Sequence, residues 1–185
     1  MSGQTPSQTV GPYFAYGLAS QQYHYPLGQI ANGEIAGEGA PGRIRIVGRV
    51  FDGRGEPIPD ALVEFWQADS EGRFGAEGFR GFGRQGTGTD PSGRFSFETI
   101  KPGATAGAAP FITIVLFMRG LLIHVYTRLY FADEEAANAA DPVLATVPAE
   151  RRRTLIASRE TTAGGVVYRF DIHMQGADET VFFDL

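Results

Sequence analysis

The chain contains no cysteine and no long hydrophobic run, and each absence excludes a class of protein. Without cysteine among its 185 residues, it can form no disulfide, no thiolate metal site and no cysteine nucleophile. Its longest apolar stretch, residues 111–118, is far shorter than the roughly 20 residues that span a bilayer. The first residues show no basic segment followed by an apolar one, which is the pattern of a secretory signal. We therefore expect a cytoplasmic protein without membrane contact.

Positive charge and histidine are also scarce. The net charge is -5, so long-range attraction to nucleic acid is not expected. His24, His124 and His173 are far apart and form no His-x-His or His-Glu-x-x-His spacing, which favours ordinary strand or arm positions over a metal site. The only dense basic run, residues 151–153, follows a plausible helix start and is interpreted as a solvated helix face.

The sequence has the composition of a globular domain, with 43% hydrophobic and 20% charged residues. From Arg43 onward, short β-branched and aromatic segments alternate with Gly- and Pro-rich turns. This pattern is typical of an all-β fold, either an antiparallel sandwich or a barrel. The expected strands are residues 43–52, 61–68, 95–100, 111–118, 123–131 and 166–174, with a short final run at 180–183. We predict an antiparallel β-sandwich over residues 43–185.

One or two short helices are expected to interrupt the strands. Residues 132–140 have acidic residues early and good helix formers after, and Asp141-Pro142 is expected to end this helix. Residues 148–157 are a second short candidate. The Gly-rich residues 81–88 are interpreted as a flexible loop, because they lack the Gly-Lys ending of a phosphate-binding loop. Trp66, on an apolar strand, is expected in core or interface packing.

Residues 1–42 differ from the rest of the chain. They are rich in Gly, Pro, Ser and Gln and show little alternation, a composition compatible with disorder. They nevertheless contain Tyr13, Phe14, Tyr16, Tyr23 and Tyr25, which are too many aromatic residues for a solvated linker. We expect an extended N-terminal arm that packs on a partner subunit.

Two features are candidates for ligand recognition. Arg119 follows the apolar strand 111–118, where it either marks the strand end or presents a planar guanidinium to a carboxylate. The segment Thr5-Pro-Ser-Gln-Thr-Val-Gly-Pro-Tyr13 is either a plain Pro-rich turn or a stiffened arm that places a hydroxyl and a phenol in a neighbour's cleft. The residues alone leave both alternatives open.

That N-terminal segment, together with Leu116-Phe-Met-Arg-Gly120 and Glu179-Thr-Val-Phe-Phe-Asp184, supports a resemblance to a known family. Over nearly its whole length the chain resembles the intradiol ring-cleaving dioxygenases, and among them the alpha type of subunit. In this family an alpha subunit works beside a beta subunit that binds iron. The resemblance therefore implies a hetero-oligomeric enzyme in which this chain is the subunit without metal.

The resemblance also assigns the positions of the lost metal ligands. In the beta subunits, Fe(3+) is held by two tyrosines and two histidines. The first tyrosine falls on Phe74 here, the second falls in the region of Ala104 and Thr105, and the histidines fall on Phe111 and Thr113. With all four side chains replaced, we expect this chain to bind no metal and the partner beta subunit to hold the iron.

The family further implies a substrate cleft at the interface between alpha and beta subunits. Its alpha-side residues map onto Thr9, Gly11, Pro12, Tyr13 and Arg119, with no catalytic residue on this chain. The implied reaction is O2-dependent cleavage of protocatechuate (3,4-dihydroxybenzoate) to 3-carboxy-cis,cis-muconate in the β-ketoadipate pathway. Arg119 would place positive charge near the substrate carboxylate.

Two other functions are compatible with parts of the sequence. Transthyretin-like β-sandwich binding modules share the turn pattern of the middle strands and have no enzyme activity. A self-sufficient iron dioxygenase would need two tyrosines and two histidines to converge, and the spacing of these residues speaks against it.

Overall fold

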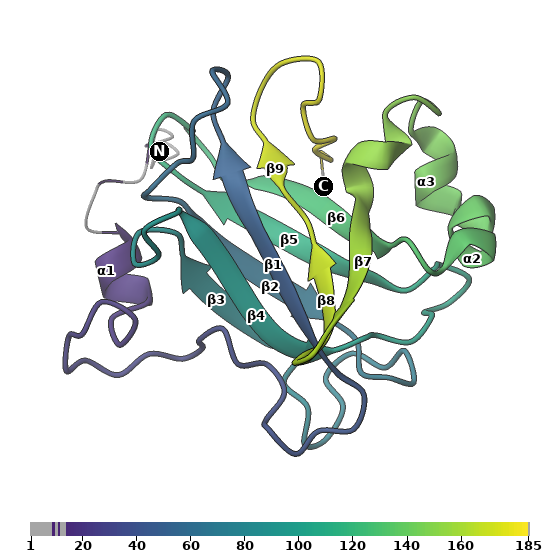
Figure 1. The fold of residues 1–185 in the computed structure, drawn as a ribbon, viewed down its shortest axis with the longest axis horizontal. Helices are drawn as coiled ribbons and strands as arrows, with labels where there is room; N and C mark the ends of the chain where they lie inside the picture. The colour runs from purple at the N-terminus through teal and green to yellow at the C-terminus, as the bar shows by residue number, and fades with distance from the viewer. Residues whose placement is uncertain (1–8, 10, 12–13, 185) are drawn as a thin grey trace, which may run out of the picture.

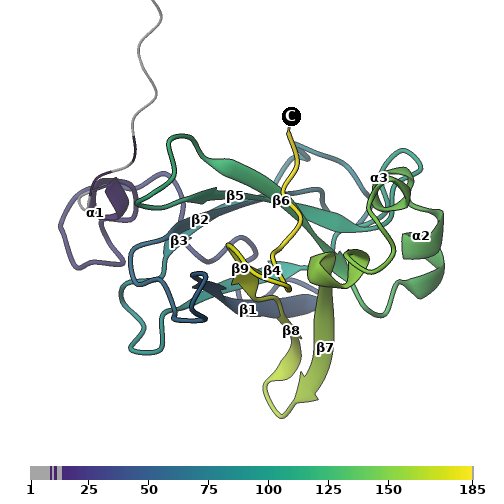
Figure 2. The same ribbon diagram turned by 90° about the horizontal axis from the view of Figure 1, so that it is seen from above.

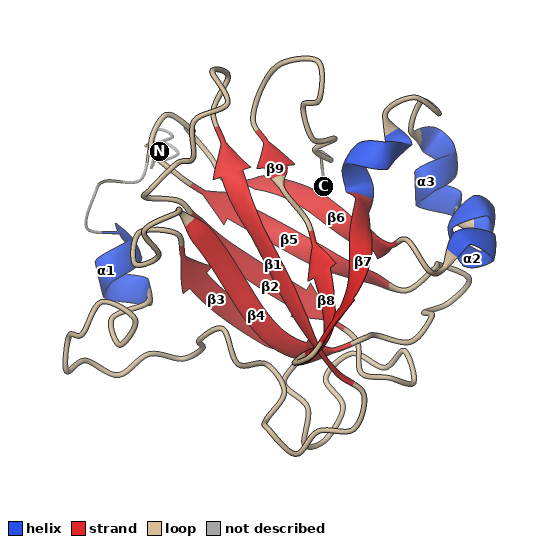
Figure 3. Ribbon diagram, in the orientation of Figure 1, coloured by secondary structure: helices blue, strands red, loops and turns tan. Residues whose placement is uncertain are grey.

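The computed structural model describes Thr9, Gly11 and residues 14–184. The described part of the chain is mostly sheet, with a few short helices (Figures 1 and 3). The helical elements are α1 (Phe14–Leu18), α2 (Glu135–Ala140), α3 (Pro142–Thr146) and the 3₁₀ helix η1 (Arg152–Leu155). The strands are β1 (Arg43–Phe51), β2 (Leu62–Gln67), β3 (Phe82–Gly86), β4 (Arg94–Ile100), β5 (Phe111–Phe117), β6 (Val125–Phe131), β7 (Ile156–Thr162), β8 (Gly165–Arg169) and β9 (Ile172–His173).

The strands form one continuous path that curls into a nearly closed, barrel-like sheet. Its order is β3-β2-β5-β6-β7-β8-β1-β4, and β9 pairs with β1. Seen from above, the two halves of this path face each other (Figure 2). Most neighbours are antiparallel, but β1–β8, β1–β9 and β6–β7 are parallel. The expected antiparallel two-sheet sandwich is therefore not confirmed, although the all-β class is.

The N-terminal region fills the gap between the two edge strands of this path. The backbone N–H of Arg84 in β3 donates to the carbonyl of Asn32, and the N–H of Glu98 in β4 donates to that of Gly33. The backbone N–H of Ile35 donates to the carbonyl of Glu98. These bonds satisfy backbone groups that an open edge would leave exposed for aggregation. Residues 32–35 thus link the ends of the path within the chain itself.

The core lies inside the barrel and follows from the alternation of each strand. In β5, every second residue is buried, and β4 has the same pattern. The interior is filled by aromatic and branched side chains that include Phe65, Phe95 and Phe97. Gly48 in β1 is required at one tight crossing, because a Cβ there would lie 1.8 Å from the Phe170 carbonyl oxygen. A second apolar cluster, around Tyr130 and Leu144, lies beneath α3.

Several expected elements are confirmed, and others are wrong for identifiable reasons. The strands expected at 43–52, 61–68, 95–100, 111–118 and 123–131 are present within two residues at each end. The expected strand 166–174 divides into β8 and β9, and the final run contributes only a bridge between Phe183 and Tyr126. Residues 82–86 are not a flexible loop but form strand β3, which pairs with β2. Gly83 and Gly86 leave room for Ile35 and Tyr23 of the N-terminal region, which pack closely against this strand.

The helical predictions are only partly correct. Helix α2 ends where expected, but Asp141 then begins a further helix, since its carboxylate accepts bonds from the N–H groups of Val143 and Leu144. The second candidate, residues 148–157, is reduced to η1 and continues into the unexpected strand β7. In the basic run, Arg151 and Arg152 donate to the carbonyls of Glu179 and Val147, so a solvated helix face is the wrong description.

Residues 14–42 contain a short helix that lies on the chain's own barrel. In α1, Ala15 is buried, and with Ala19 it packs against Leu62 of β2. Gln22 donates to the carbonyl of Gly86 at 2.7 Å, beyond the end of the helix. This region is therefore less extended than expected. Its packing on a partner subunit stays a prediction, and residues 1–8, 10 and 12–13 lie outside the described part.

Candidate functional site

The first candidate site lies where β5 ends. Arg119 follows the strand by two residues, and Gly120 turns the chain with a positive φ of 93°. The side chain of Arg119 is 60% exposed, and its Nε donates to the carboxylate of Asp60, in the turn before β2. Among the described residues, no other carboxylate lies within ion-pairing distance of Arg119. Its two terminal nitrogens form no hydrogen bond with another of the described residues.

The N-terminal arm reaches the same place. The N–H of Gly120 donates to the hydroxyl oxygen of Thr9 at 3.1 Å. Phe14 donates its N–H to the carbonyl of Gly11, and its ring lies 5.3 Å from that of Phe117. The structure thus brings Thr9 and Gly11 beside the loop that holds Arg119. Pro12 and Tyr13 lie outside the described residues.

Sequence reasoning missed three neighbours of this end of β5. Asp60 gives no periodic signal, because it stands in a turn. His124 lies 5.3 Å from Phe117, ring to ring, and its Nε2 is 2.7 Å from the Tyr126 hydroxyl. Only Tyr126 could have been found from the sequence, because the period-two alternation of β6 places it on the same face as Arg128 and Tyr130.

The second candidate site is at the opposite end of β5, where the family comparison placed the lost metal ligands. The rings of Phe74 and Phe111 lie 6.4 Å apart, and Phe74 stacks on Trp66 at 6.0 Å. Thr113 faces Trp66 across the β2–β5 pair. Thr105 donates its hydroxyl to the carbonyl of Gly72, in the loop that carries Phe74. We call Phe74, Phe111 and Thr113 the former metal position.

Trp66 and Phe74 are both 40% exposed at this position. Trp66 therefore does not lie in the core, and of the two alternatives for it only interface packing stays a prediction. Phe82 of β3 adds a third ring, 6.3 Å from Trp66. Three partly exposed aromatic rings thus gather on the outer face of the sheet here, which is unusual for a surface in contact with water.

The side chains of the former metal position do not fit iron. Phenylalanine has no donor atom, and one threonine hydroxyl cannot replace two histidines and a tyrosinate. The guanidinium carbon of Arg128 lies 4.2 Å from the Phe111 ring centroid, and Arg128 faces Thr113 across the strand pair. The positive charge of Arg128 beside these side chains would in addition repel a cation. No group of three His, Asp or Glu side chains among the described residues could hold a metal either.

Beneath this position, Tyr130 and Asp141 form a buried polar pair. The Tyr130 hydroxyl donates to Asp141 at 3.1 Å and accepts from Arg128 at 3.3 Å. Burial is the main cause that raises the pKa of Tyr130 to about 12, so the phenol stays protonated at neutral pH. This hydroxyl is occupied by its bonds to Arg128 and Asp141.

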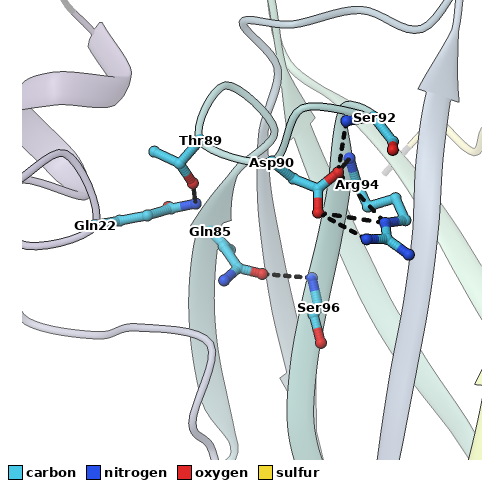
Figure 4. A network of polar contacts seen from close by, with 7 residues as sticks. All are labelled: Gln22, Gln85, Thr89, Asp90, Ser92, Arg94 and Ser96. Carbon is cyan, nitrogen blue, oxygen red and sulfur yellow. Dashed lines mark hydrogen bonds and ion pairs between the residues drawn. The ribbon is translucent and has the colours of Figure 1, made fainter.

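A groove of about 390 Å³ lies between the N-terminal region and β4, and Figure 4 shows its polar contacts. Gln22 donates to Thr89, and the N–H of Ser96 donates to the side-chain oxygen of Gln85. Both arginines of the groove are already in ion pairs, Arg94 with Asp90 and Arg45 with Glu98.

The two candidate sites are far apart. They occupy the two ends of β5, and a strand of this length spans about 20 Å. Helix α1 marks the Arg119 end, whereas α2 and α3 lie at the other (Figure 1). A single catechol ring is much shorter than this separation, so it cannot contact both sites of one chain. No described helix has the length and apolar character needed to cross a membrane.

Comparisons with known proteins agree on the family. The family model described as Dioxygenase matches residues 10–176. The protocatechuate 3,4-dioxygenase alpha chain of Burkholderia cepacia is 57% identical over 98% of this chain and 98% of its own length. The beta chain from the same organism is 34% identical over 91% of this chain and 77% of its own length.

A solved structure extends this agreement to the fold. The dioxygenase domain of a carbohydrate-binding fusion protein from Streptomyces sp. SirexAA-E aligns with a TM-score of 0.63 at 26% identity, covering 95% of this chain and all of that domain. The resemblance inferred from the sequence motifs is confirmed. The chain therefore belongs to the intradiol dioxygenase family, among the protocatechuate 3,4-dioxygenase alpha chains.

Proposed function

We propose that this chain is the subunit that completes the substrate cleft of an iron-binding beta subunit in a protocatechuate 3,4-dioxygenase. The observation that supports this most is the separation of the two candidate sites along β5. Arg119 and Thr9 lie too far from the former metal position to serve a ligand bound there. They act instead in the cleft of another chain.

In that cleft, Arg119 recognises the carboxylate of 3,4-dihydroxybenzoate. Asp60 holds the Nε, which leaves the two terminal nitrogens to form paired hydrogen bonds with the carboxylate oxygens. Because Asp60 fixes the guanidinium plane, less side-chain freedom is lost when the substrate binds. Thr9, Gly11, Pro12 and Tyr13 line the same cleft from the arm, with the Thr9 contact to Gly120 fixing the arm beside Arg119.

Iron belongs to the beta subunit in this proposal, since the former metal position here has no suitable donors. The metal supplies the chemistry by which O2 opens the ring between the two hydroxyl-bearing carbons, giving 3-carboxy-cis,cis-muconate. This chain contributes binding and orientation of the carboxylate. A place in the β-ketoadipate pathway and a cytoplasmic location complete the proposal.

Reconstitution tests the proposal directly. The chain and a beta chain are purified separately, then mixed, and O2 uptake with 3,4-dihydroxybenzoate is measured before and after mixing. We expect negligible turnover by either chain alone and full turnover by the mixture, with the two chains co-eluting in gel filtration. A beta chain that is equally active without this chain would contradict the proposal.

The alternative of a transthyretin-like binding module is not favoured. Its basis was the turn pattern of the middle strands, whereas the similarity to dioxygenase chains extends over nearly the whole sequence.

A further inference from the structure

Arg128 lies beside Phe111 and Thr113 of the former metal position. It faces Thr113 across the β5–β6 pair, so the two side chains share one face of the sheet. Its guanidinium carbon lies 4.2 Å from the centroid of the Phe111 ring, within the usual range for a cation–π contact. The positive charge therefore stands among the side chains that replace the metal ligands.

The position of this guanidinium is fixed indirectly. Arg128 donates through Nη1 to the Tyr130 hydroxyl, which in turn donates to Asp141. Asp141 is fully buried and also accepts the backbone N–H of Ala109 at 2.9 Å. Among the described residues, no carboxylate forms a direct ion pair with Arg128. The buried carboxylate of Asp141 thus positions Arg128 through the Tyr130 hydroxyl. No direct contact with a described carboxylate neutralises the charge of Arg128.

We propose that Arg128 closes the former metal position to cations by placing its guanidinium beside the side chains that replace the metal ligands. Two separate causes then exclude a metal. One is the loss of the donor side chains, and the other is the positive charge of Arg128, which repels a cation. Replacing the donors alone would consequently not restore metal binding. The inference rests on the proposed function in one respect, because the donor positions come from the family resemblance.

The test reintroduces donors with and without the arginine. The variant Phe74→Tyr, Thr105→Tyr, Phe111→His, Thr113→His, which restores all four donor types, is prepared in complex with the beta subunit, and the same variant is prepared with Arg128→Gln. Iron is counted per pair of chains, relative to the unmodified complex, and tyrosinate-to-iron absorption is recorded. With Arg128 present we expect less than about a tenth of an additional equivalent of iron. With Arg128→Gln we expect close to a full additional equivalent and stronger visible absorption.

Two controls separate charge from other effects. Arg128→Lys keeps the positive charge and is expected to leave the donor variant poor in iron. Arg84→Gln removes the other arginine stacked on this face, which is paired with Glu64, and is also expected to admit no iron. All variants are compared by thermal unfolding and by gel filtration to establish that each is folded and assembled.

Two results would overturn the proposal. One is a full equivalent of additional iron in the donor variant that retains Arg128. The other is the absence of additional iron when Arg128 is replaced and the variant is folded, since the arginine would then not be what closes the position. If the chain did not assemble with a beta chain, the proposed function would fail. The same metal counts on the full chain alone would still decide the role of Arg128.

Discussion

At the scale of single residues, Arg119 has the clearest expected effect. Replacing it by alanine in the assembled enzyme removes a charge-assisted contact worth about 1.5–3 kcal/mol, so the KM for 3,4-dihydroxybenzoate should rise about 10- to 150-fold. Catechol has no carboxylate, and its KM should change much less. Arg119→Lys should restore only part of the loss, because an ammonium group lacks the planar fork. Steady-state kinetics with both substrates and both variants measure this difference.

Equal losses for the two substrates would show that Arg119 stabilises packing or the interface and does not bind the carboxylate. Arg153→Ala is a matched control, because Arg153 is similarly exposed and paired with Asp178 elsewhere on the surface. It should leave both KM values unchanged.

Individual residues were predictable from the sequence to different degrees. The apolar strand that ends at Arg119 was visible, and the motif comparison placed Phe74, Phe111 and Thr113 together, as the structure shows. The partner of Arg119 could not be predicted, because Asp60 is distant in sequence and no local pattern indicates which carboxylate a guanidinium will contact. The position of Arg128 over Phe111 needed the β5–β6 register, which alternation alone does not fix.

At the scale of elements, Asp141 joins α3 to the sheet. It is fully buried and accepts N–H groups from Ala109, Val143 and Leu144. Asp141→Ala would leave these donors without partners and remove the helix cap, so it should lower the free energy of unfolding by about 2–4 kcal/mol. Chemical denaturation measures this loss. Glu135→Ala, an exposed change in the neighbouring helix α2, should stay within about 0.5 kcal/mol, and an equally small effect for Asp141→Ala would contradict the capping role.

The N-terminal arm is the second element with a testable role. Deleting residues 1–11 removes the Thr9–Gly120 contact but keeps α1 and its packing on Leu62. The chain should therefore remain folded, while its affinity for the beta subunit and the turnover of the complex should fall. Deleting residues 1–4 alone serves as the control and should have little effect. Unchanged assembly and turnover after the longer deletion would exclude the arm from the shared cleft.

The elements were predicted well where their pattern was local. Alternating strands such as β4 and β5 were recognisable, since one face of each is buried. Strands β3 and β7 were missed, because glycines weaken the signal of the first and five of seven residues are exposed in the second. The sequence pattern did not decide between a sandwich and a barrel, because closure depends on residues 32–35 joining two edge strands through backbone bonds that leave no mark in the side chains.

At the scale of the whole molecule, a network around Asp133 joins β4, β8 and the turn after β6. Asp133 binds Lys101 at 2.9 Å and accepts the hydroxyl of Tyr168 at 3.0 Å. Burial acts to raise the pKa of Asp133, but the bonds from Lys101 and Tyr168 outweigh it and hold this pKa below its ordinary value. The stabilisation is therefore complete above the ordinary aspartate pKa of about 3.9 and is lost as the pH falls through the lower, folded-state value.

Asp133→Asn should accordingly be less stable than the unmodified chain at neutral pH, and the difference should vanish in acid. Thermal unfolding between neutral and strongly acidic pH follows both proteins. A stability difference that persists undiminished below the pKa of Asp133 would show that the ion pair with Lys101 is not its cause.

In the whole assembly, the iron content of each chain shows which subunit binds the metal. Iron is counted by elemental analysis, and each chain by amino-acid analysis, in the isolated chain and in its complex with the beta subunit. We predict no significant iron and no tyrosinate-to-iron colour in the isolated chain, and one iron for each pair of chains in the complex. A full equivalent of iron in the isolated chain, or two for each pair, would contradict the conclusion that this chain contributes to a cleft whose metal is held by its partner.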